Sequence, residues 1–262
     1  MKHGRVLFFL IFMFTFLGAH VLCAQTWPHT KEMGVFLCHA SFSLKEMENH
    51  LAVLDDLQTE VREKLKLDVP KEKIEVYFFS DEASWRAYHA RAFPSISYRR
   101  ALFVKPDVII QTKRSRGRVY VYVSDRLTSD LRHEGTHALL HAMLGKPLPI
   151  WLDEGLAEYF EADPQWAEPT QQRITSGKMI PLKQLEKITG MRGMTRDAYG
   201  DSWAWVTFLL DGPEDVRRIL PEYLNDFSKK LFFSSISSRL GKLHRRPDAL
   251  LRTFFLDRTS EN

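Results

Sequence analysis

The first half of the chain combines short apolar runs with one long stretch of helical periodicity. Val35–Ala40, Lys73–Ser80 and Val119–Val123 are short runs rich in β-branched and aromatic residues, a composition that predicts strands. Val108–Thr112 predicts a further strand. Between about Ser43 and Leu67, leucine, methionine and valine recur three or four positions apart, which predicts a long helix with one apolar face.

The second half of the chain has a helical pattern almost throughout. A helix is expected from about Asp125 or Thr128 to Leu144, where Gly145 and Pro147 end it. Further helices are expected at Ile150–Glu161, Leu182–Thr189, Ala198–Leu210, Pro213–Phe227 and Ala249–Leu256. This order predicts an α+β fold in one domain, residues 25–262, with a small mixed sheet in an α/β part (35–124) and a mostly helical part (125–262).

Residues 1–24 have the layout of a secretory signal peptide. Lys2 and Arg5 precede the apolar run Val6–Leu17, and small residues follow it before Cys23 and Ala24. The apolar run is shorter than the roughly 20 residues that span a bilayer. We therefore expect export and cleavage near residue 24. The alternative is an uncleaved signal anchor, and only in that case is the protein expected to be bound to a membrane.

Charge and cysteine content narrow the range of partners. The net charge of +4 is mildly basic, and two of the positive charges lie in the expected signal peptide. The densest basic run, Lys113–Arg118, is interpreted as an exposed loop, so no nucleic-acid partner is expected. Cys38 would be the only cysteine of the mature chain. Without an internal disulfide, stability must come from the core or from a metal ion.

The stretch LRHEGTHALLH, residues 131–141, contains the pattern HExxH. Residues four apart on an α-helix are separated by about 40° around its axis, so His133 and His137 can bind one metal ion from successive turns. Glu134 lies beside them and can reach a water molecule on that metal without being a ligand. A shuffled chain of this composition would contain the pattern in roughly one case in forty, so the motif alone does not decide the matter.

A second motif, LPIWLDEGLAEYFE, begins at Leu148 and supplies further carboxylates. A catalytic zinc ion takes three protein ligands and one water, and Glu154 is the candidate for the third ligand. Glu158 lies one turn later on the same face, where it can accept the free N–H of a histidine ligand. The alternative is an ordinary amphipathic helix, which accounts for the apolar residues of the motif but not for two inward-facing glutamates.

The paired motifs HEGTH and PIWLDEGLAEYF resemble those of the gluzincin metallopeptidases, closest to the peptidase MA-like families, over roughly Val119–Leu210. The resemblance implies a zincin-like fold in which His133, His137 and Glu154 bind Zn²⁺ and Glu134 is the general base. Such families often continue with a Y-x-x-S-W segment, present here from Tyr199. By resemblance Tyr199 donates a hydrogen bond to the oxyanion, although it also fits a purely packing role.

The expected function is that of an exported zinc metallopeptidase. The strand Val119–Val123 precedes the motif helix and is expected to be a sheet edge that pairs with an extended peptide or protein substrate. Two alternatives are a zincin-fold binding module without activity and a zinc hydrolase of a non-peptide amide or a cell-wall substrate. Aminopeptidase activity is not expected, because Lys45 stands where a G-x-M-E-N segment would have its glycine.

Overall fold

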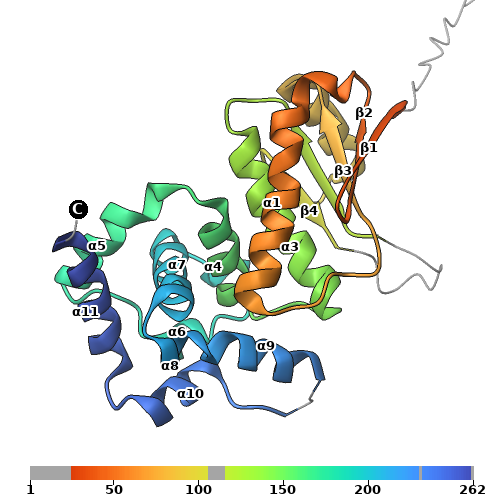
Figure 1. Ribbon diagram of the computed structural model, residues 1–262. Coiled ribbons are helices and arrows are strands. Elements are labelled where there is room, and N and C mark those ends of the chain that lie inside the picture. Colours follow the sequence, from red (N-terminus) through yellow and green to blue (C-terminus); the bar gives the residue numbers. More distant parts are fainter. Residues whose placement is uncertain (1–24, 106–115, 230–231, 261–262) are drawn as a thin grey trace, which may run out of the picture.

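The computed structural model describes residues 25–105, 116–229 and 232–260. The expected signal peptide, the strand at Val108–Thr112 and the first part of the basic loop Lys113–Arg118 lie outside these residues. The described chain is an α+β fold with a five-stranded sheet and a mostly helical second half, so the predicted fold class is confirmed (Figure 1). Within the described residues, no helix combines the length and hydropathy needed to cross a bilayer.

The sheet is mixed, with its parallel strands in the centre. Its strands are β1 (His29–Met33), β2 (Phe36–Ala40), β3 (Ile74–Phe79), β4 (Leu102–Val104) and β5 (Arg118–Tyr122), in the spatial order β1-β2-β3-β5-β4. β2, β3 and β5 are parallel, whereas β1 and β4 pair antiparallel at the two edges. The expectation that Val119–Val123 forms an edge is therefore wrong. The short strand β4, which the sequence pattern did not reveal, covers that side of β5.

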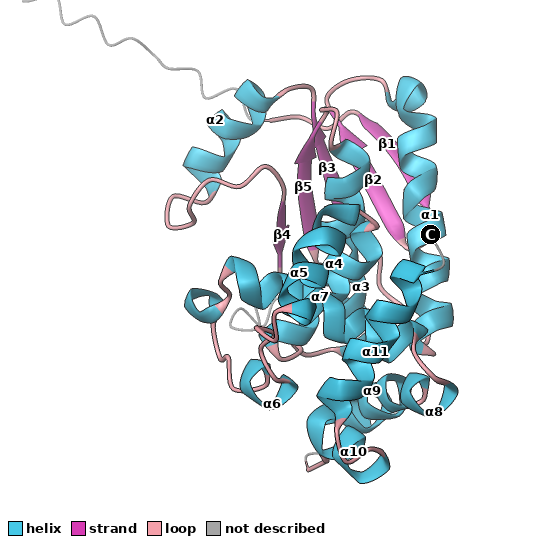
Figure 2. Cartoon of the chain, turned by 90° about the vertical axis from the view of Figure 1, so that its left-hand side faces the viewer, coloured by secondary structure: helices cyan, strands magenta, loops and turns pink. Residues whose placement is uncertain are grey.

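Successive side chains along each strand point to opposite faces of the sheet, and the two faces pack against different helices. Val76, Phe78, Val119 and Val121 belong to the main core, which is formed with helices α1 (Glu48–Leu65) and α3 (Leu127–Leu144). The intervening aromatic residues, including Phe79 and Tyr120, face the other way and pack against α2 (Glu82–Ala92) (Figure 2). Asp81 begins α2 by accepting a hydrogen bond from the backbone N–H of Ser84 at 2.8 Å.

The second half of the chain packs on α3 through two further helices. α4 (Ile150–Glu161) lies against α3 on one side and α7 (Arg196–Asp211) on the other. Short and medium helices surround this pair: α5 (Ala167–Thr175), α6 (Leu182–Leu185), α8 (Glu214–Arg217), α9 (Ile219–Lys229), α10 (Ile236–Leu243) and α11 (Pro247–Ser260). Three 3₁₀ turns complete the described elements: η1 (Leu44–Met47), η2 (Pro164–Trp166) and η3 (Met191–Gly193).

A glycine allows α4 and α7 to approach closely. A Cβ atom placed on Gly155 would lie 2.8 Å from the backbone oxygen of Ser202. Because that neighbour is backbone, it cannot move aside without shifting the helix. Gly155 therefore fixes the spacing of the two helices, and with it the positions of Glu154 on α4 and Tyr199 on α7.

We expect Gly155→Ala to destabilise the protein by about 1–3 kcal/mol, because the added methyl group forces the helices apart. Gly241→Ala on α10 is the matched control: nothing lies within 4 Å of a Cβ there, and its φ is not positive. Alanine in that helical position should be neutral or stabilising by up to about 1 kcal/mol. Denaturant unfolding with a chelator present measures both variants, and equal stabilities would contradict the role given to Gly155.

Candidate metal centre

Helix α3 presents the two motif histidines on successive turns. Their ring centroids are 5.0 Å apart, and each ring directs its Nε2 atom toward the start of α4. α3 ends at Gly145, whose φ of 70° is in the left-handed region that glycine adopts without strain. The chain then turns back through Pro147 and Pro149 and begins α4 at Ile150. This tight connection brings Glu154 opposite the two histidines.

The three predicted ligands converge on one point. Glu154 Oε2 lies 3.8 Å from His133 Nε2 and 3.7 Å from His137 Nε2. All three ligand atoms lie within 4.8 Å of one another, so these residues could hold a metal ion. Donors about 2.1 Å from a tetrahedral zinc ion are separated by about 3.4 Å, so small inward shifts would complete the coordination. The donor set of two imidazoles and one carboxylate thus fits zinc and leaves a position for water.

The electrostatics of this cluster favour an added positive charge. Burial opposes the charged form of His137, but Asp153, followed by Glu154 and Glu134, outweighs that effect and raises the pKa of His137 to about 10. Burial and the charge of His137 lower the pKa of His133, but the hydrogen bond with Glu161 and the charges of Glu134 and Glu161 together outweigh them, so this pKa is also raised. Both shifts report a surplus of carboxylates around the rings. A divalent cation would neutralise that surplus in place of the protons.

The far nitrogen of each histidine faces a second carboxylate. His133 Nδ1 is 2.9 Å from Glu161 Oε2, in hydrogen-bond geometry. His137 Nδ1 lies 3.3 Å from Asp153 Oδ2, an ion-pair distance without the alignment of a hydrogen bond. Carboxylates in such positions fix which ring nitrogen carries the proton, and leave Nε2 free for a metal.

These contacts correct the expectation for Glu158. Instead of accepting from a histidine, Glu158 Oε2 accepts from Trp166 Nε1 at 2.5 Å and from Gln165 Nε2 at 3.1 Å. Glu161 follows Glu154 by seven positions, which places it only about 20° away around the helix, whereas Glu158 is about 40° away. Helical spacing alone therefore contained a signal for Glu161 that the sequence analysis missed.

A second group of side chains is also close enough to hold a metal ion. It consists of His133, Glu158 and Glu161. Its carboxylates, however, already have partners. Glu161 accepts hydrogen bonds from Ser129 and from Arg126, the latter at 3.3 Å, and Glu158 is held by Trp166. The set with Glu154 is the better metal site, because Glu154 Oε2 lies within 3.8 Å of both Nε2 atoms, whereas both carboxylates of the second group are held by other side chains.

Glu134 stays outside the ligand set, as the motif predicts for a general base. Its Oε2 accepts a hydrogen bond from the backbone N–H of Phe103 at 2.7 Å. Phe103 is the middle residue of β4, the edge strand, so this N–H points away from the sheet and toward α3. Among the described strands, the outer edge of β4 therefore runs beside the candidate metal centre, a position expected from the sequence for Val119–Val123.

Tyr199 lies in the first turn of α7. Thr195 caps this helix by accepting a hydrogen bond from the backbone N–H of Ala198. Burial raises the pKa of Tyr199, and the nearby charge of Glu154 adds to the effect, while Arg99 opposes it. The phenol therefore remains protonated near neutral pH and is close enough to Glu154 to feel its charge.

Comparisons with known proteins give only a distant likeness. A scan against models of protein families finds no match, and neither does a search of curated proteins. Among solved structures, the chain is similar to an M1 zinc metallopeptidase from Deinococcus radiodurans, with 15% identity, a TM-score of 0.42, and coverage of 87% of this chain and 50% of that one. A point mutant of that enzyme gives 16% identity, a TM-score of 0.39 and coverage of 87% and 51%.

The chain thus spans about half the length of these structures. A likeness at this level leaves the function to be argued from the residues of the chain itself.

We expect Glu161→Gln to weaken metal binding by about 10- to 100-fold, because the neutral amide no longer polarises the His133 ring. Glu158→Gln is the matched control on the same helix and should change the affinity less, since Glu158 bonds to Trp166. Competition against a chromophoric chelator measures both affinities. A larger loss of metal affinity in Glu158→Gln than in Glu161→Gln would show that Glu158, and not Glu161, orients the histidine.

Proposed function

We propose that this protein is a zinc-dependent metallopeptidase. The observation that carries the proposal is the convergence of His133 Nε2, His137 Nε2 and Glu154 Oε2, with Glu134 beside them and outside the ligand set. Two imidazoles and one carboxylate are the ligand pattern of a catalytic rather than a structural zinc site, which would use four protein ligands. Export is proposed as well, supported by the sequence pattern of residues 1–24 alone.

Each side chain has a distinct task in the proposed reaction. A zinc ion held by His133, His137 and Glu154 would supply Lewis acidity, which lowers the pKa of water and polarises a carbonyl group. Glu134 would accept the proton of the attacking water and pass it to the leaving amine. Tyr199 would donate its phenolic hydrogen to the oxygen on which negative charge develops.

The outer edge of β4 is the proposed path of the substrate. An extended peptide can pair with an unpaired strand edge through backbone hydrogen bonds. In this sheet the edge beside the centre is β4, and the N–H of its middle residue, Phe103, reaches the proposed base at 2.7 Å. A peptide on this edge would lie with its backbone next to Glu134. The same amide also holds the Glu134 carboxylate in one orientation.

The decisive experiment compares the purified protein with Glu134→Gln on casein and on a mixed peptide library read by mass spectrometry. The wild-type protein should cleave peptide bonds, and a chelator should stop cleavage until zinc is restored. Glu134→Gln should bind zinc with unchanged stoichiometry and lose activity by at least about 10²-fold, the contribution expected of a general base. Glu222→Gln, an exposed glutamate on α9, is the charge-matched control and should retain full activity.

Two results would overturn the proposal. Full activity in Glu134→Gln would show that Glu134 is not the general base of the reaction. Zinc binding without cleavage of any peptide would favour a binding module or a hydrolase of a non-peptide substrate.

Phe103→Pro tests the backbone contact to Glu134. Proline lacks the N–H and is tolerated on edge strands where the N–H faces away from the sheet. We expect this variant to fold, to bind zinc as the wild type does, and to lose about tenfold or more in kcat, a typical effect of losing one hydrogen bond to a charged group. Phe103→Ala keeps the amide and controls for loss of the ring. Equal kcat in both variants would show that the amide has no part in catalysis.

A further inference from the structure

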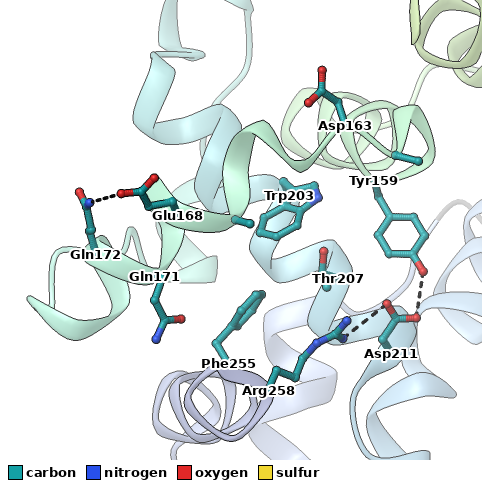
Figure 3. A pocket seen from close by; sticks show the side chains of 12 residues that line it. Tyr159, Asp163, Glu168, Gln171, Gln172, Trp203, Thr207, Asp211, Phe255 and Arg258 are labelled. Atoms are coloured by element: carbon teal, nitrogen blue, oxygen red, sulfur yellow. Dashed lines mark hydrogen bonds and ion pairs between the residues drawn. The ribbon is translucent and has the colours of Figure 1, made fainter. Parts of the chain in front are cut away.

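A second cavity lies in the helical half, apart from the metal centre. It is open to solvent on one side, is bounded by α4, α5, α7 and α11, and has a volume of about 760 Å³ (Figure 3). Neither the two histidines of the centre nor Glu134 or Glu154 lines it. Cavities that bind small molecules are typically about 300–1,000 Å³. The size therefore fits an organic ligand rather than a single ion.

Aromatic side chains form the walls of this cavity. Trp203 of α7 and Phe255 of α11 are in contact, with ring centroids 5.9 Å apart and planes inclined at 49°. Tyr159 of α4 completes the apolar lining on another side (Figure 3). Trp203 and Tyr159 are only half-buried, so they leave ring surface exposed within the cavity. A flat apolar group can stack against such surfaces, and a cation can lie over their faces.

One polar group in the lining has no partner. The hydroxyl of Thr207 has no hydrogen bond to any described residue, although only 5% of the side chain is exposed. In Figure 3 its side chain stands between Trp203, Asp211 and Phe255, within the ring of lining residues. Buried hydroxyl groups are almost always hydrogen-bonded, often in helices to the carbonyl four residues earlier. A ligand with a donor or acceptor group would supply the missing partner.

The lining of the cavity contains three carboxylates and one cation. Of the three lining carboxylates, Asp163 is paired with Arg126 at 2.9 Å and Asp211 with Lys64 at 2.8 Å. Glu168 accepts only a hydrogen bond from Gln172 Nε2 at 3.2 Å and forms no ion pair within the described part of the chain. Arg258, the one lining cation, lies 3.8 Å from Asp211. Glu168, an exposed side chain, is thus the lining carboxylate left without an ion pair in the described part of the chain, and a ligand cation can pair with it.

We propose that this cavity is a binding site for a small organic cation that carries an aromatic ring and a hydrogen-bonding group. The ring would lie against Trp203 and Phe255, the cation would face Glu168, and the polar group would bond to the Thr207 hydroxyl. This binding goes beyond the proposed peptidase activity and does not depend on it, since the cavity and the metal centre are lined by different side chains.

Three indole compounds with the same ring and linker test the proposal by calorimetry on the full protein. Tryptamine carries an ammonium group, tryptophol a neutral hydroxyl group and indole-3-propionate a carboxylate. Tryptamine should bind at one site per chain, at least about tenfold more tightly than indole-3-propionate, because only the cation can pair with Glu168. A chelator is present throughout, so that an amine on a metal ion cannot produce the signal.

Two variants locate the binding site. Glu168→Gln should reduce the affinity for tryptamine about tenfold and leave that for tryptophol unchanged, whereas the distant control Glu222→Gln should alter neither. Gln171→Trp, which fills the cavity from α5, should abolish binding of all three compounds.

Thr207→Val tests the unpartnered hydroxyl. Valine has nearly the same shape, so the free protein should not lose thermal stability, because no hydrogen bond is broken. The affinity for tryptamine should nevertheless fall severalfold. No binding of tryptamine, equal binding of the three compounds, or wild-type affinity in Glu168→Gln or in Thr207→Val would overturn the proposal.

Discussion

Several carboxylates are buried together between α3 and α4, and the surrounding residues must supply positive charges and hydrogen-bond donors to compensate them. Glu154, Glu158 and Glu161 are each 7–8% exposed and follow one another along one helix. Removing a charge from water is costly unless it is paired. Arg126 supplies one compensating positive charge, and the indole N–H of Trp166 supplies a hydrogen-bond donor. The pKa values of both histidines are raised, so protonated imidazole rings supply the remaining positive charge. A bound divalent cation would replace the last of these.

The scaffold around this cluster keeps its members in place. α3 follows β5 directly and packs on the sheet, so the histidines are positioned by the main core rather than by a loop. α4 is held against α3 by the tight turn at Gly145 and against α7 by the close approach at Gly155. Arg100 adds a two-pronged contact to Asp130, which ties the segment before β4 to α3 one turn before His133. β4, α3 and Glu154 are thereby fixed relative to one another.

The local sequence pattern predicted where helices and strands lie along the chain better than it predicted which of them pack against one another. The bounds of α4 agree with the expected Ile150–Glu161, because its apolar spacing and flanking prolines are local signals. Val119–Val123 was correctly recognised as a strand, yet its place in the sheet depends on β4, three residues long and separated from it by more than ten positions. Nothing local distinguishes such a short strand from a loop. β1, with its polar sequence, escaped prediction for the same reason.

The same holds for the candidate site. The positions of the motif residues were predicted from the sequence, whereas the residues that contact them from other parts of the fold were not. The two histidines and Glu154 lie together as their spacing predicted, since one helix and one tight turn suffice to bring them there. The Phe103 amide could not be foreseen, because a backbone group has no identity in a sequence. Glu161 was within reach of the helical argument, but the choice between two glutamates on one face depends on where α3 crosses α4.

The C-terminal end of α4 joins the metal centre to the second cavity. Arg126 Nη2 bonds both to Glu161, at 3.3 Å, and to Asp163, at 2.9 Å. Glu161 in turn holds His133, while Asp163 lines the cavity. One guanidinium group therefore divides its hydrogen bonds between the carboxylate that bonds to His133 and a carboxylate that lines the cavity. A group that competes for Asp163 would change the share of the Arg126 hydrogen bonds left to Glu161, although no side chain lines both the cavity and the candidate metal centre.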